Sequence, residues 1–445
     1  MSTLDAPTRR LRVLYFIGSY GPDVMGNASH EDTVLALRAR GHSVDVLTQV
    51  TRPGEPRFGK AIFAGVPTYS VNLAAQGQGG LLGSLAGVPG RLLTWAAQRF
   101  LRYEYIFTLL SAYKRHLSRY HYDLVHVEGA YPFGWVAARG SGKTPYIVNV
   151  QGADVIDLPD YDYGYRRFAL PRVAVRQALD RAALVRVISS LLGDYLVEQH
   201  LAVRDRIRVI LRAIERDAFP PPGVLLPALR EQGRSLLAER YGAGLARPVV
   251  MVISRLHPFK GLEYLVDAMK LVADAMRAEG KEPPWLIIGG PSRTTENYGD
   301  YREFLRDRAE KAGVANMVLF TGQVEHSLVR DHLAGADVFV CPSILEAQNK
   351  VVPEAAAVGT PSVVTETTGI ASYLAPHEAC VSIPPRSAEA IADGILRLLR
   401  DPEYYNGISL NALKMADTLR VENVAPQLEE AWYEAEGIKG KARTV

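Results

Sequence analysis

Residues 336–358 read ADVFVCPSILEAQNKVVPEAAAV, and two glutamates, Glu346 and Glu354, stand within this stretch. The apolar run 336–341 before them is typical of a buried strand, and the run 351–358 after them is typical of a helix. The glutamates therefore bracket the turn from the carboxyl end of a strand into a helix. Open α/β sheets bind their ligands at such turns, so the stretch predicts both a parallel α/β sheet and a ligand site on it.

A second strand pattern, residues 249–254, runs into the segment RLHPFKG at 255–261. This segment places two cations, Arg255 and Lys260, at another strand end. Arg can hold two phosphate oxygens at once and Lys acts as a point charge, while the two carboxylates suit hydroxyl groups. The pattern therefore suits a sugar nucleotide. Each cation alone would more often be a solvated loop residue, but the combined motif favours a phosphate site.

Composition narrows the class of protein. A chain of 445 residues with 48% hydrophobic and 22% charged residues is typical of two or three globular domains. Its net charge of +3 is too small to indicate a nucleic-acid partner. The two cysteines, Cys341 and Cys380, form neither a disulfide framework nor a metal-binding pattern, which indicates a reducing, cytoplasmic location. We expect no signal peptide at the polar N-terminus and no membrane-spanning helix.

Strand patterns alternate with helix patterns along the chain, which predicts parallel βαβ units. In the first half the expected strands are 11–17, 43–48, 124–127, 146–150, 184–188 and 207–211, with a helix at 30–40. In the second half the expected strands are 249–254, 285–288, 317–320, 338–341 and 362–364, with helices at 261–279 and 301–312 among those between them.

The predicted fold class is α/β, with two doubly wound, Rossmann-like domains that face a cleft. Residues 1–215 would form the first domain and residues 216–420 the second. Residues 421–445 would form a helix and tail that pack back toward the first domain. The stretch 212–235 contains three consecutive prolines and a glycine, and it is expected to link the domains.

These motifs resemble those of the retaining GT-B glycosyltransferases of family 4, the group 1 enzymes. Members carry a Gly-Arg-Leu-x-x-x-Lys-Gly segment, two spaced glutamates and a Glu-Ala-Met-Ala-x-Gly-x-Pro segment. The matching positions here are 254–261, Glu346 with Glu354, and 354–361. Residues 320–324 match a Phe-x-Gly-x-Val element, and residues 40–44 match an Arg-Gly-His-x-Val element. The resemblance is specific over 249–369 and looser in the first half; it implies a GT-B fold with the acceptor on the first domain and the donor on the second.

The resemblance implies roles for the four charged residues. Lys260 and Arg255 would hold the donor diphosphate and offset the charge that develops as the sugar–oxygen bond breaks. Glu354 would accept hydrogen bonds from the ribose hydroxyls, although a carboxylate in a first helical turn also suits the helix dipole without any ligand. Glu346 would position the sugar or stabilise an oxocarbenium-like state, because the family implies front-face substitution and not the carboxylate nucleophile of retaining glycosidases. No metal is implied.

The rest of the donor site is expected nearby. At the amino end of the helix, backbone N–H groups would meet the sugar hydroxyls. The family usually has Gly-Phe-Gly in this segment. In this chain side chains replace those glycines at the expected sugar pocket, so the family's usual donor sugar is not implied here. Gln323 and Val324 would flank the nucleobase, and Gly289 and Gly290 would permit close backbone approach, although glycines after strands are common. The residues at the helix end are Ala347, Gln348, Asn349, Lys350 and Val351.

In the first half, Gly21 and Gly26 belong to a loop that would face the diphosphate and the acceptor. The loop is not the GxGxxG fingerprint, which argues against a nicotinamide cofactor. His126 and Glu128 end a strand pattern and would line the acceptor side of the cleft. A buried histidine with a structural role is at least as good an interpretation of His126.

Two further departures from the family lie in the first half. Gln151 stands where the family has a histidine that contacts the sugar, so a base titrating near neutrality is excluded there. Asp154 ends the matching segment and is also expected to line the cleft. The segment Ile210-Leu211-Arg212-Ala213-Ile214 replaces the usual Asn-Gly-Val near the expected hinge.

The stretch 81–120 combines aromatic residues with arginines and lysines and contains a single acid, Glu104. Basic, aromatic and helical patterning suits peripheral contact with the inner face of an anionic membrane, and the acceptor would then be lipid-linked. The alternative is a pair of ordinary helices that cover the first sheet and keep their arginines in water.

The resemblance thus implies a retaining, metal-independent hexosyltransferase with no cofactor. It would move a hexose from a UDP- or GDP-linked donor to a hydroxyl of a glycan, glycolipid or small molecule, with α-linkage, in polysaccharide or glycolipid biosynthesis. Two alternatives stay open. A GT-B nucleotide-sugar epimerase or hydrolase would release free nucleotide without transfer. A non-catalytic GT-B scaffold subunit would tolerate the loss of Glu346 and Lys260.

Overall fold

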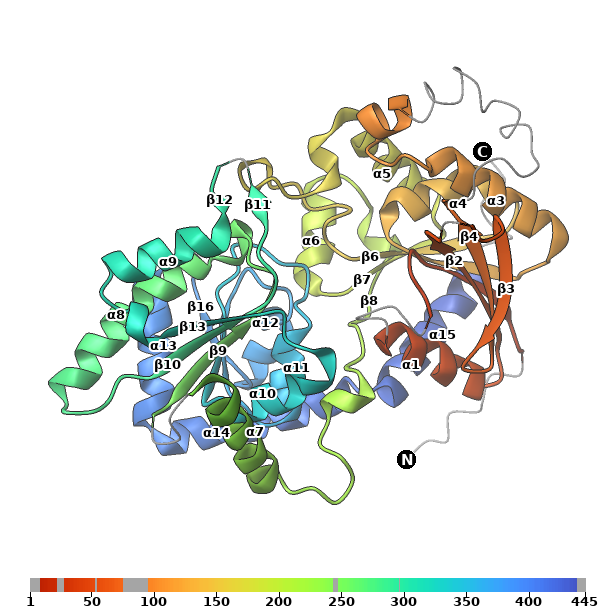
Figure 1. The fold of residues 1–445 in the computed structure, drawn as a ribbon. Helices are drawn as coiled ribbons and strands as arrows, with labels where there is room; N and C mark the ends of the chain where they lie inside the picture. The colour runs from red at the N-terminus through yellow and green to blue at the C-terminus, as the bar shows by residue number, and fades with distance from the viewer. Residues whose placement is uncertain are drawn as a thin grey trace.

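The computed structural model describes residues 9–21, 28–52, 54–74, 95–242, 247–295 and 297–437. It contains two large α/β sheets that lie side by side, each flanked by helices (Figure 1). Strands that alternate with helices along the sequence form such layers because each crossover helix packs on a face of the sheet. The predicted α/β class with two doubly wound domains is confirmed. The exact domain limits stay a prediction.

The first sheet has the order β3-β4-β2-β1-β5-β6-β7-β8, and every pair is parallel except β3 with β4. The strand order reverses between β1 and β5, which marks a switch point at their carboxyl ends. Its strands are β1 Arg12–Phe16, β2 Ser43–Val50, β3 Phe58–Phe63, β4 Val66–Asn72, β5 Leu124–Glu128, β6 Tyr146–Val150, β7 Leu184–Val187 and β8 Ile207–Val209.

Helices cover both faces of this sheet. Alternate residues of β1 enter opposite cores: Leu14 and Phe16 lie in the core with α3 to α5, whereas Val13 and Tyr15 lie in the core with α1 and α15. This alternation follows from the period of two along a strand. The helices are α1 Ala28–Ala39, α3 Ile106–Arg119, α4 Trp135–Gly140, α5 Ala169–Arg181 and α6 Ser190–Glu198.

The second sheet is entirely parallel, with the order β13-β10-β9-β14-β15-β16 and a switch point between β9 and β14. Its strands are β9 Val249–Ile253, β10 Trp285–Gly289, β13 Val318–Gly322, β14 Val338–Cys341, β15 Ser362–Thr365 and β16 Val381–Ile383. The helices are α7 Leu226–Tyr241, α8 Leu262–Ala278, α9 Tyr301–Lys311, α10 Val329–Gly335, α11 Val351–Ala357, α12 Ala371–Leu374, α13 Ala388–Arg400 and α14 Pro402–Thr418. A short hairpin, β11 Thr294–Thr295 with β12 Gly299–Asp300, lies apart from the sheet.

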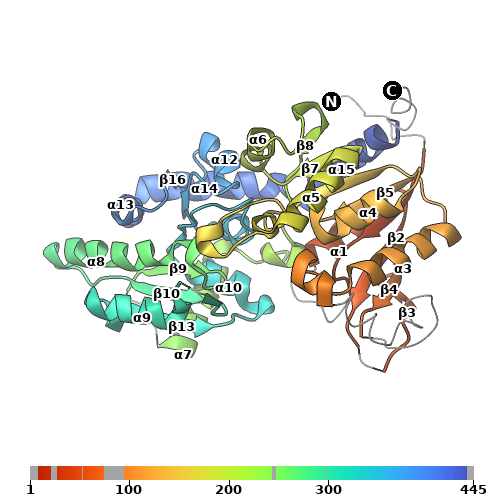
Figure 2. The same cartoon turned by 90° about the horizontal axis from the view of Figure 1, so that it is seen from above.

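The last helix, α15 Val421–Gly437, packs on the first sheet and not on the second, against α1, β5 and β6 (Figure 2). Its Trp432 is fully buried, and the indole Nε1 donates to Nδ1 of His126 at 3.0 Å. The end of the chain therefore completes the core of the first domain.

The stretch expected to link the domains is partly helical, which corrects that prediction. Helix α7 begins at Leu226 and packs closely on α10. Gly233 makes the approach possible, because a Cβ there would lie 2.3 Å from the carbonyl oxygen of Asp331. Only Leu229, Gly233 and Leu237 of this helix are buried. Its apolar face is therefore too narrow to give a recognisable helical pattern in the sequence. The sequence reading also missed β3, β4 and β16.

Candidate active site

The switch point of the second sheet brings the two charged motifs together. Strands β9 and β14 are direct neighbours, with Val338 paired to Val250 and Phe339 to Met251. The segment with Arg255 and Lys260 leaves β9 and the segment with Glu346 leaves β14 at the same edge, as the doubly wound order requires. A small pocket lies between these strand ends and is lined by residues that include Ser254, Lys260, Pro342, Ser343 and Asn349.

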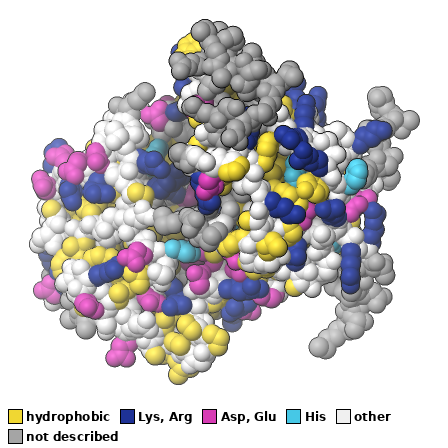
Figure 3. Space-filling view, turned by 45° about the vertical axis from the view of Figure 1, so that its right-hand side comes forward, with side chains coloured by type: hydrophobic (Ala, Val, Ile, Leu, Met, Phe, Trp, Pro, Cys, Tyr) yellow, Lys and Arg dark blue, Asp and Glu magenta, His cyan; other side chains and the backbone are white. Residues whose placement is uncertain are grey.

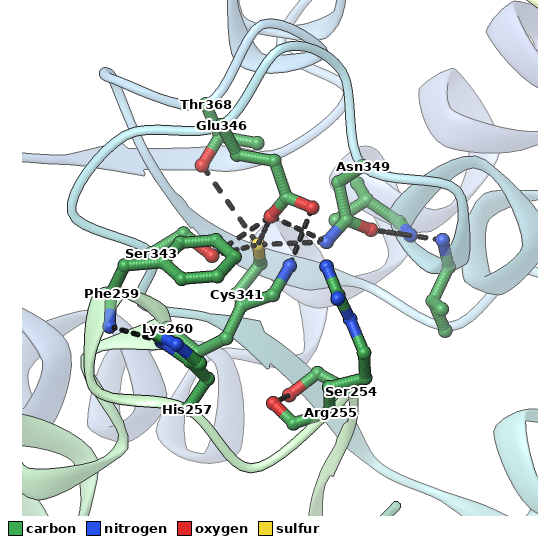
Figure 4. A network of polar contacts seen from close by, with 12 residues as sticks. Ser254, Arg255, His257, Phe259, Lys260, Cys341, Ser343, Glu346, Asn349 and Thr368 are labelled. Carbon is green, nitrogen blue, oxygen red and sulfur yellow. Dashed lines mark hydrogen bonds and ion pairs between the residues drawn. The ribbon is translucent and has the colours of Figure 1, made fainter. Parts of the chain in front are cut away.

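Lys260 and Glu346 form a largely buried ion pair, with Nζ 2.5 Å from Oε1 (Figure 4). The other oxygen, Oε2, accepts hydrogen bonds from Ser343 Oγ at 2.9 Å and Asn349 Nδ2 at 3.1 Å. Burial opposes ionisation of Glu346, but the charge of Lys260 and these hydrogen bonds outweigh it, so the pKa of Glu346 lies below its ordinary value. Glu346 is therefore an ionised carboxylate with both oxygens engaged.

A tight turn holds Lys260 in place. Residues Pro258–Lys260 form a 3₁₀ turn whose amino end is capped by His257 Nδ1, which accepts from the N–H of Phe259. Gly261 follows with φ of 65°, and a Cβ there would lie 2.2 Å from the carbonyl oxygen of Pro342. Arg255 is exposed, and its guanidinium points into the same space as the Lys260 ammonium (Figure 4). Both cations thus face one side of the site.

Asn349 shapes the loop that leads into α11. It adopts φ of 72°, and its Oδ1 accepts from the N–H groups of Val351 at 2.8 Å and Val352 at 2.9 Å. Of these two amides, only that of Val351 was expected to meet the sugar. Its N–H already has an acceptor in Asn349 Oδ1, and its contact with the sugar stays a prediction.

Two other loop residues contact the first domain. The carbonyl oxygen of Ala347 accepts from Ser189 Oγ at 2.5 Å, and Gln348 Oε1 accepts from the N–H of Arg212 at 3.2 Å. Both Ala347 and Gln348 are buried. Ala347 thus contacts the first domain through its backbone, whereas Gln348 does so with a side chain that the family's Gly-Phe-Gly segment lacks.

A second charge network surrounds Glu354 at the start of α11. Lys350 Nζ lies 2.5 Å from Oε1 of the fully buried Glu215 and 3.5 Å from Oε1 of Glu354. Burial raises the pKa of Glu354 to about 7, and Lys350 offsets only part of that effect. Glu215 lies where the chain leaves the first sheet after β8 and also accepts a backbone hydrogen bond from Ser29 at 3.1 Å, so it joins both halves of the chain. The sequence reading did not single out Glu215.

Within the described residues, one group has metal-ligating side chains close enough to share an ion: Glu215, Asp217 and His326. Nε2 of His326 lies 2.7 Å from Oε2 of Glu215. Because Lys350 and His326 already supply donors to this carboxylate, we assign the group to an ion-pair network rather than to a metal site.

The residues expected near the nucleobase lie at the ends of β10 and β13. Gly290 has φ of 136°, and a Cβ there would lie 1.7 Å from the carbonyl oxygen of Ser254, so only glycine fits. Gly289 lies against the Val324 side chain, and Gln323 is exposed. The structure thus brings all four residues to the same sheet edge as Arg255.

In the first domain, Glu128 is the centre of a buried polar cluster. Its carboxylate accepts from Tyr15 Oη at 2.5 Å, Asn149 Nδ2 at 2.5 Å and the side-chain amide of Gln151. Burial opposes ionisation, but His30, His126 and Arg186 hold the pKa of Glu128 well below its ordinary value. An ionised carboxylate can only accept hydrogen bonds. Glu128 therefore holds Gln151 with its side-chain NH₂ group directed at the carboxylate.

The remaining first-domain predictions have different outcomes. His126 is fully buried between Glu128 and Trp432, so it does not line the cleft and is the structural histidine of the alternative interpretation. Asp154 is buried and accepts from the N–H groups of Ala130, Gln151 and Gly152, which fixes the loop after β6. Gly21 lies in the loop after β1, and Gly26 lies outside the described residues.

Comparison with known proteins identifies this arrangement. The family model for glycosyl transferases group 1 matches residues 236–415, and the model for a glycosyl transferase 4-like domain matches residues 27–212. The chain belongs to the group 1 glycosyltransferases. The motifs at 254–261, Glu346 and Glu354 lie inside the first match, and the Gln151 segment lies inside the second.

Individual relatives agree with the family. The D-inositol 3-phosphate glycosyltransferase of Corynebacterium glutamicum is 26% identical over 91% of this chain and 90% of its own length. The Bacillus subtilis glycosyltransferase TuaC is 27% identical over 62% of this chain, which spans only 61% of that relative. Among solved structures, Anabaena HepE in complex with UDP and glucose superposes with a TM-score of 0.67 at 19% identity, over 95% of this chain and 99% of the other. This last likeness shows that the GT-B fold is shared.

Proposed function

We propose that this glycosyltransferase is a retaining, metal-independent hexosyltransferase that takes a hexose from a nucleotide sugar and forms an α-linkage to an acceptor hydroxyl. The observation that carries the proposal is the convergence of Arg255 and Lys260 beside an ionised Glu346 at the switch point. Fixed cations at this place stabilise the negative charge of a departing nucleoside diphosphate without reorganisation during the reaction.

The contacts of Glu346 favour front-face substitution. One carboxylate oxygen is paired with Lys260, and the other accepts from Ser343 and Asn349. A carboxylate held in this way is a poor nucleophile, so we assign it to positioning the sugar and to stabilising positive charge at the anomeric carbon. In this mechanism the departing phosphate oxygen receives the proton of the acceptor hydroxyl as the new bond forms.

The donor is best tested with a panel. HepE was solved with UDP and glucose, which supports a uridine donor, and the charged motifs are equally compatible with a guanosine donor. The first measurement is the melting temperature of the full chain with UDP-, GDP-, ADP- and dTDP-sugars. A ligand at about 100 times its Kd stabilises the protein by roughly 2.7 kcal/mol. A shift with one donor that Lys260→Met abolishes is the expected result.

Stereochemistry and metal dependence need separate measurements. We expect proton NMR of the product to show an α-anomer from an α-linked donor, and we expect full activity in the presence of EDTA. A β-linked product, or loss of activity that Mg²⁺ or Mn²⁺ restores, would contradict these parts of the proposal. If wild type releases free nucleotide and monosaccharide at the same rate with and without acceptors, the hydrolase alternative replaces transfer. A role that survives the loss of both Lys260 and Glu346 would favour the scaffold alternative.

For the acceptor we propose a lipid-linked glycan or glycolipid at a membrane surface. Of the stretch 81–120, residues 95–120 are described, and Trp95, Phe100 and Phe107 are exposed. Phe58 and Ile62 on the edge strand β3 are also exposed, and Arg115 of α3 lies over the Phe58 ring at 5.0 Å. The exposed cations around these side chains are Lys60, Arg99, Lys114, Arg115 and Arg119.

Hydrophobic and basic side chains intermingle on this part of the surface (Figure 3). We call it the basic aromatic face. Aromatic side chains and cations together suit the headgroup region of an anionic bilayer. Across the described part of the chain, no helix combines the length and apolar character that crossing a bilayer requires, so the contact proposed is peripheral.

A further inference from the structure

A tyrosine-rich hairpin of the first domain reaches the donor-binding loops of the second. Residues 158–163 close on themselves through hydrogen bonds from the N–H of Leu158 to the carbonyl of Tyr163 at 3.0 Å and back at 3.1 Å. Gly164 ends the hairpin with φ of 99°, and a Cβ there would overlap the carbonyl oxygen of Ile156. Backbone geometry therefore fixes where the hairpin projects.

The contacts of the hairpin with the second domain include one ring contact and two hydrogen bonds. The ring of Tyr163 packs on Phe259 with 4.3 Å between centroids, in the turn that carries Lys260. At the exposed tip, Arg386 donates to Tyr161 Oη at 3.2 Å, and Asn297 donates to the carbonyl oxygen of Asp160 at 3.4 Å. Of the three contacts, only the one through Tyr163 enters the active site.

The hydroxyl of Tyr163 lies where the two domains meet. A Cβ on Gly152 would lie 3.6 Å from Tyr163 Oη and 3.1 Å from the Ala347 side chain. Arg255 is close enough to this hydroxyl to lower the pKa of Tyr163. Burial, and then the charge of Glu346, raise the pKa of Tyr163, and Arg255 offsets only part of this. The phenol therefore stays protonated near neutrality and can donate a hydrogen bond.

We propose that Tyr163 is a donor-binding residue whose hydroxyl donates a hydrogen bond to the diphosphate held by Arg255 and Lys260. The inference rests on the proposed function and extends it, because it gives the first domain a direct contact with the leaving group. A neutral donor adds directional binding without further positive charge. The tilted ring contact between Tyr163 and Phe259 would also make donor binding favour the approach of the two domains.

The test compares two tyrosines of one hairpin by isothermal titration of the full chain with UDP and with GDP. Tyr163→Phe keeps the ring on Phe259 and removes only the hydroxyl. Loss of one hydrogen bond to a charged acceptor is expected to weaken the better nucleoside diphosphate about 10-fold, with no change in the melting temperature of the free protein. Tyr161→Phe is the matched control, because its hydroxyl contacts Arg386 outside the active site, and it should bind as wild type does.

A second variant separates the hydroxyl from the ring. Tyr163→Leu should lose at least as much affinity as Tyr163→Phe, because both the hydrogen bond and the ring contact with Phe259 are removed. Equal affinities of wild type and Tyr163→Phe would overturn the role of the hydroxyl and leave the donor site intact. Failure of the wild-type chain to bind any nucleoside diphosphate would overturn the proposed function, and this inference with it.

Discussion

Lys260 Nζ lies 2.5 Å from Glu346 Oε1, although the two residues leave different strands and are separated by more than eighty positions in the chain. The pair is the point at which the loops after β9 and β14 meet. Each partner explains the burial of the other, since a charge is costly to bury unless it is paired. The same contact places an ammonium and a carboxylate next to each other at the edge of the space assigned to the donor.

Breaking this pair should affect stability as well as activity. Lys260→Met leaves Glu346 buried without its cation and should lower the free energy of unfolding by about 3 kcal/mol. Adding Glu346→Gln should restore part of the loss, so the two effects are not additive. Urea unfolding measures both. Lys270→Met is the control, because its exposed pair with Asp274 should contribute no more than about 0.5 kcal/mol; an equal loss at both sites would contradict the assignment.

Donor binding should depend on pH through Glu354. In the donor-free protein the pKa of Glu354 is raised to about 7 by burial, so the carboxyl is partly protonated at neutrality. Ribose hydroxyls donate to the ionised form and should lower that pKa. Affinity for the sugar nucleotide should therefore rise as pH increases from 6 to 8, with proton release on binding near pH 7.

Calorimetry in buffers of different ionisation enthalpy measures the proton release directly. A sugar nucleotide is the suitable ligand, because its diphosphate is esterified at both ends and does not titrate in this range. Glu354→Gln should weaken binding and remove most of the pH dependence. If the variant keeps the wild-type slope, another group is responsible, and His326, whose pKa is raised by its hydrogen bond with Glu215, is the first to examine.

The contact between α15 and the first domain should be a large contributor to stability. Trp432 is fully buried and donates to His126, so Trp432→Ala should lower the free energy of unfolding by about 3 to 5 kcal/mol through the cavity it leaves. Leu410→Ala, at an exposed position of α14, should change it by less than about 0.5 kcal/mol. Chemical unfolding followed by circular dichroism provides the comparison. A small effect at Trp432 would mean that α15 is dispensable for the core.

The basic aromatic face should bind anionic bilayers. Each exposed cation near an anionic surface contributes about 1 kcal/mol, so Lys114→Gln with Arg119→Gln should reduce partitioning onto phosphatidylglycerol-containing vesicles about 30-fold. Lys270→Gln with Lys281→Gln, a change of equal charge on the second domain, should leave partitioning unchanged. Sedimentation with vesicles measures the bound fraction. Equal losses in the two double variants would point to overall charge rather than to this face.

Much of the donor site could be read from the sequence because its residues follow strands directly. A run of buried β residues that ends in Arg255 or in Pro342-Ser343 identifies a strand end, and parallel strands align their carboxyl ends at one edge of the sheet. The same logic located Gly289, Gly290, Gln323 and Val324. The regular alternation of strand and helix also determined the fold class, since hydrophobic periodicity reports local burial.

Contacts between distant segments were decided only by the tertiary structure. Three examples are the burial of His126 under Trp432, the ion pair of Glu215 with Lys350 and the contact of Tyr163 with Phe259. In each, the sequence around one residue carries no trace of its partner. Local pattern encodes which face of an element is buried, whereas partner choice depends on how whole elements pack. The sequence by itself therefore determined the fold and the charged residues of the site, and only packing determined which of their hydrogen-bonding groups remain free for a substrate.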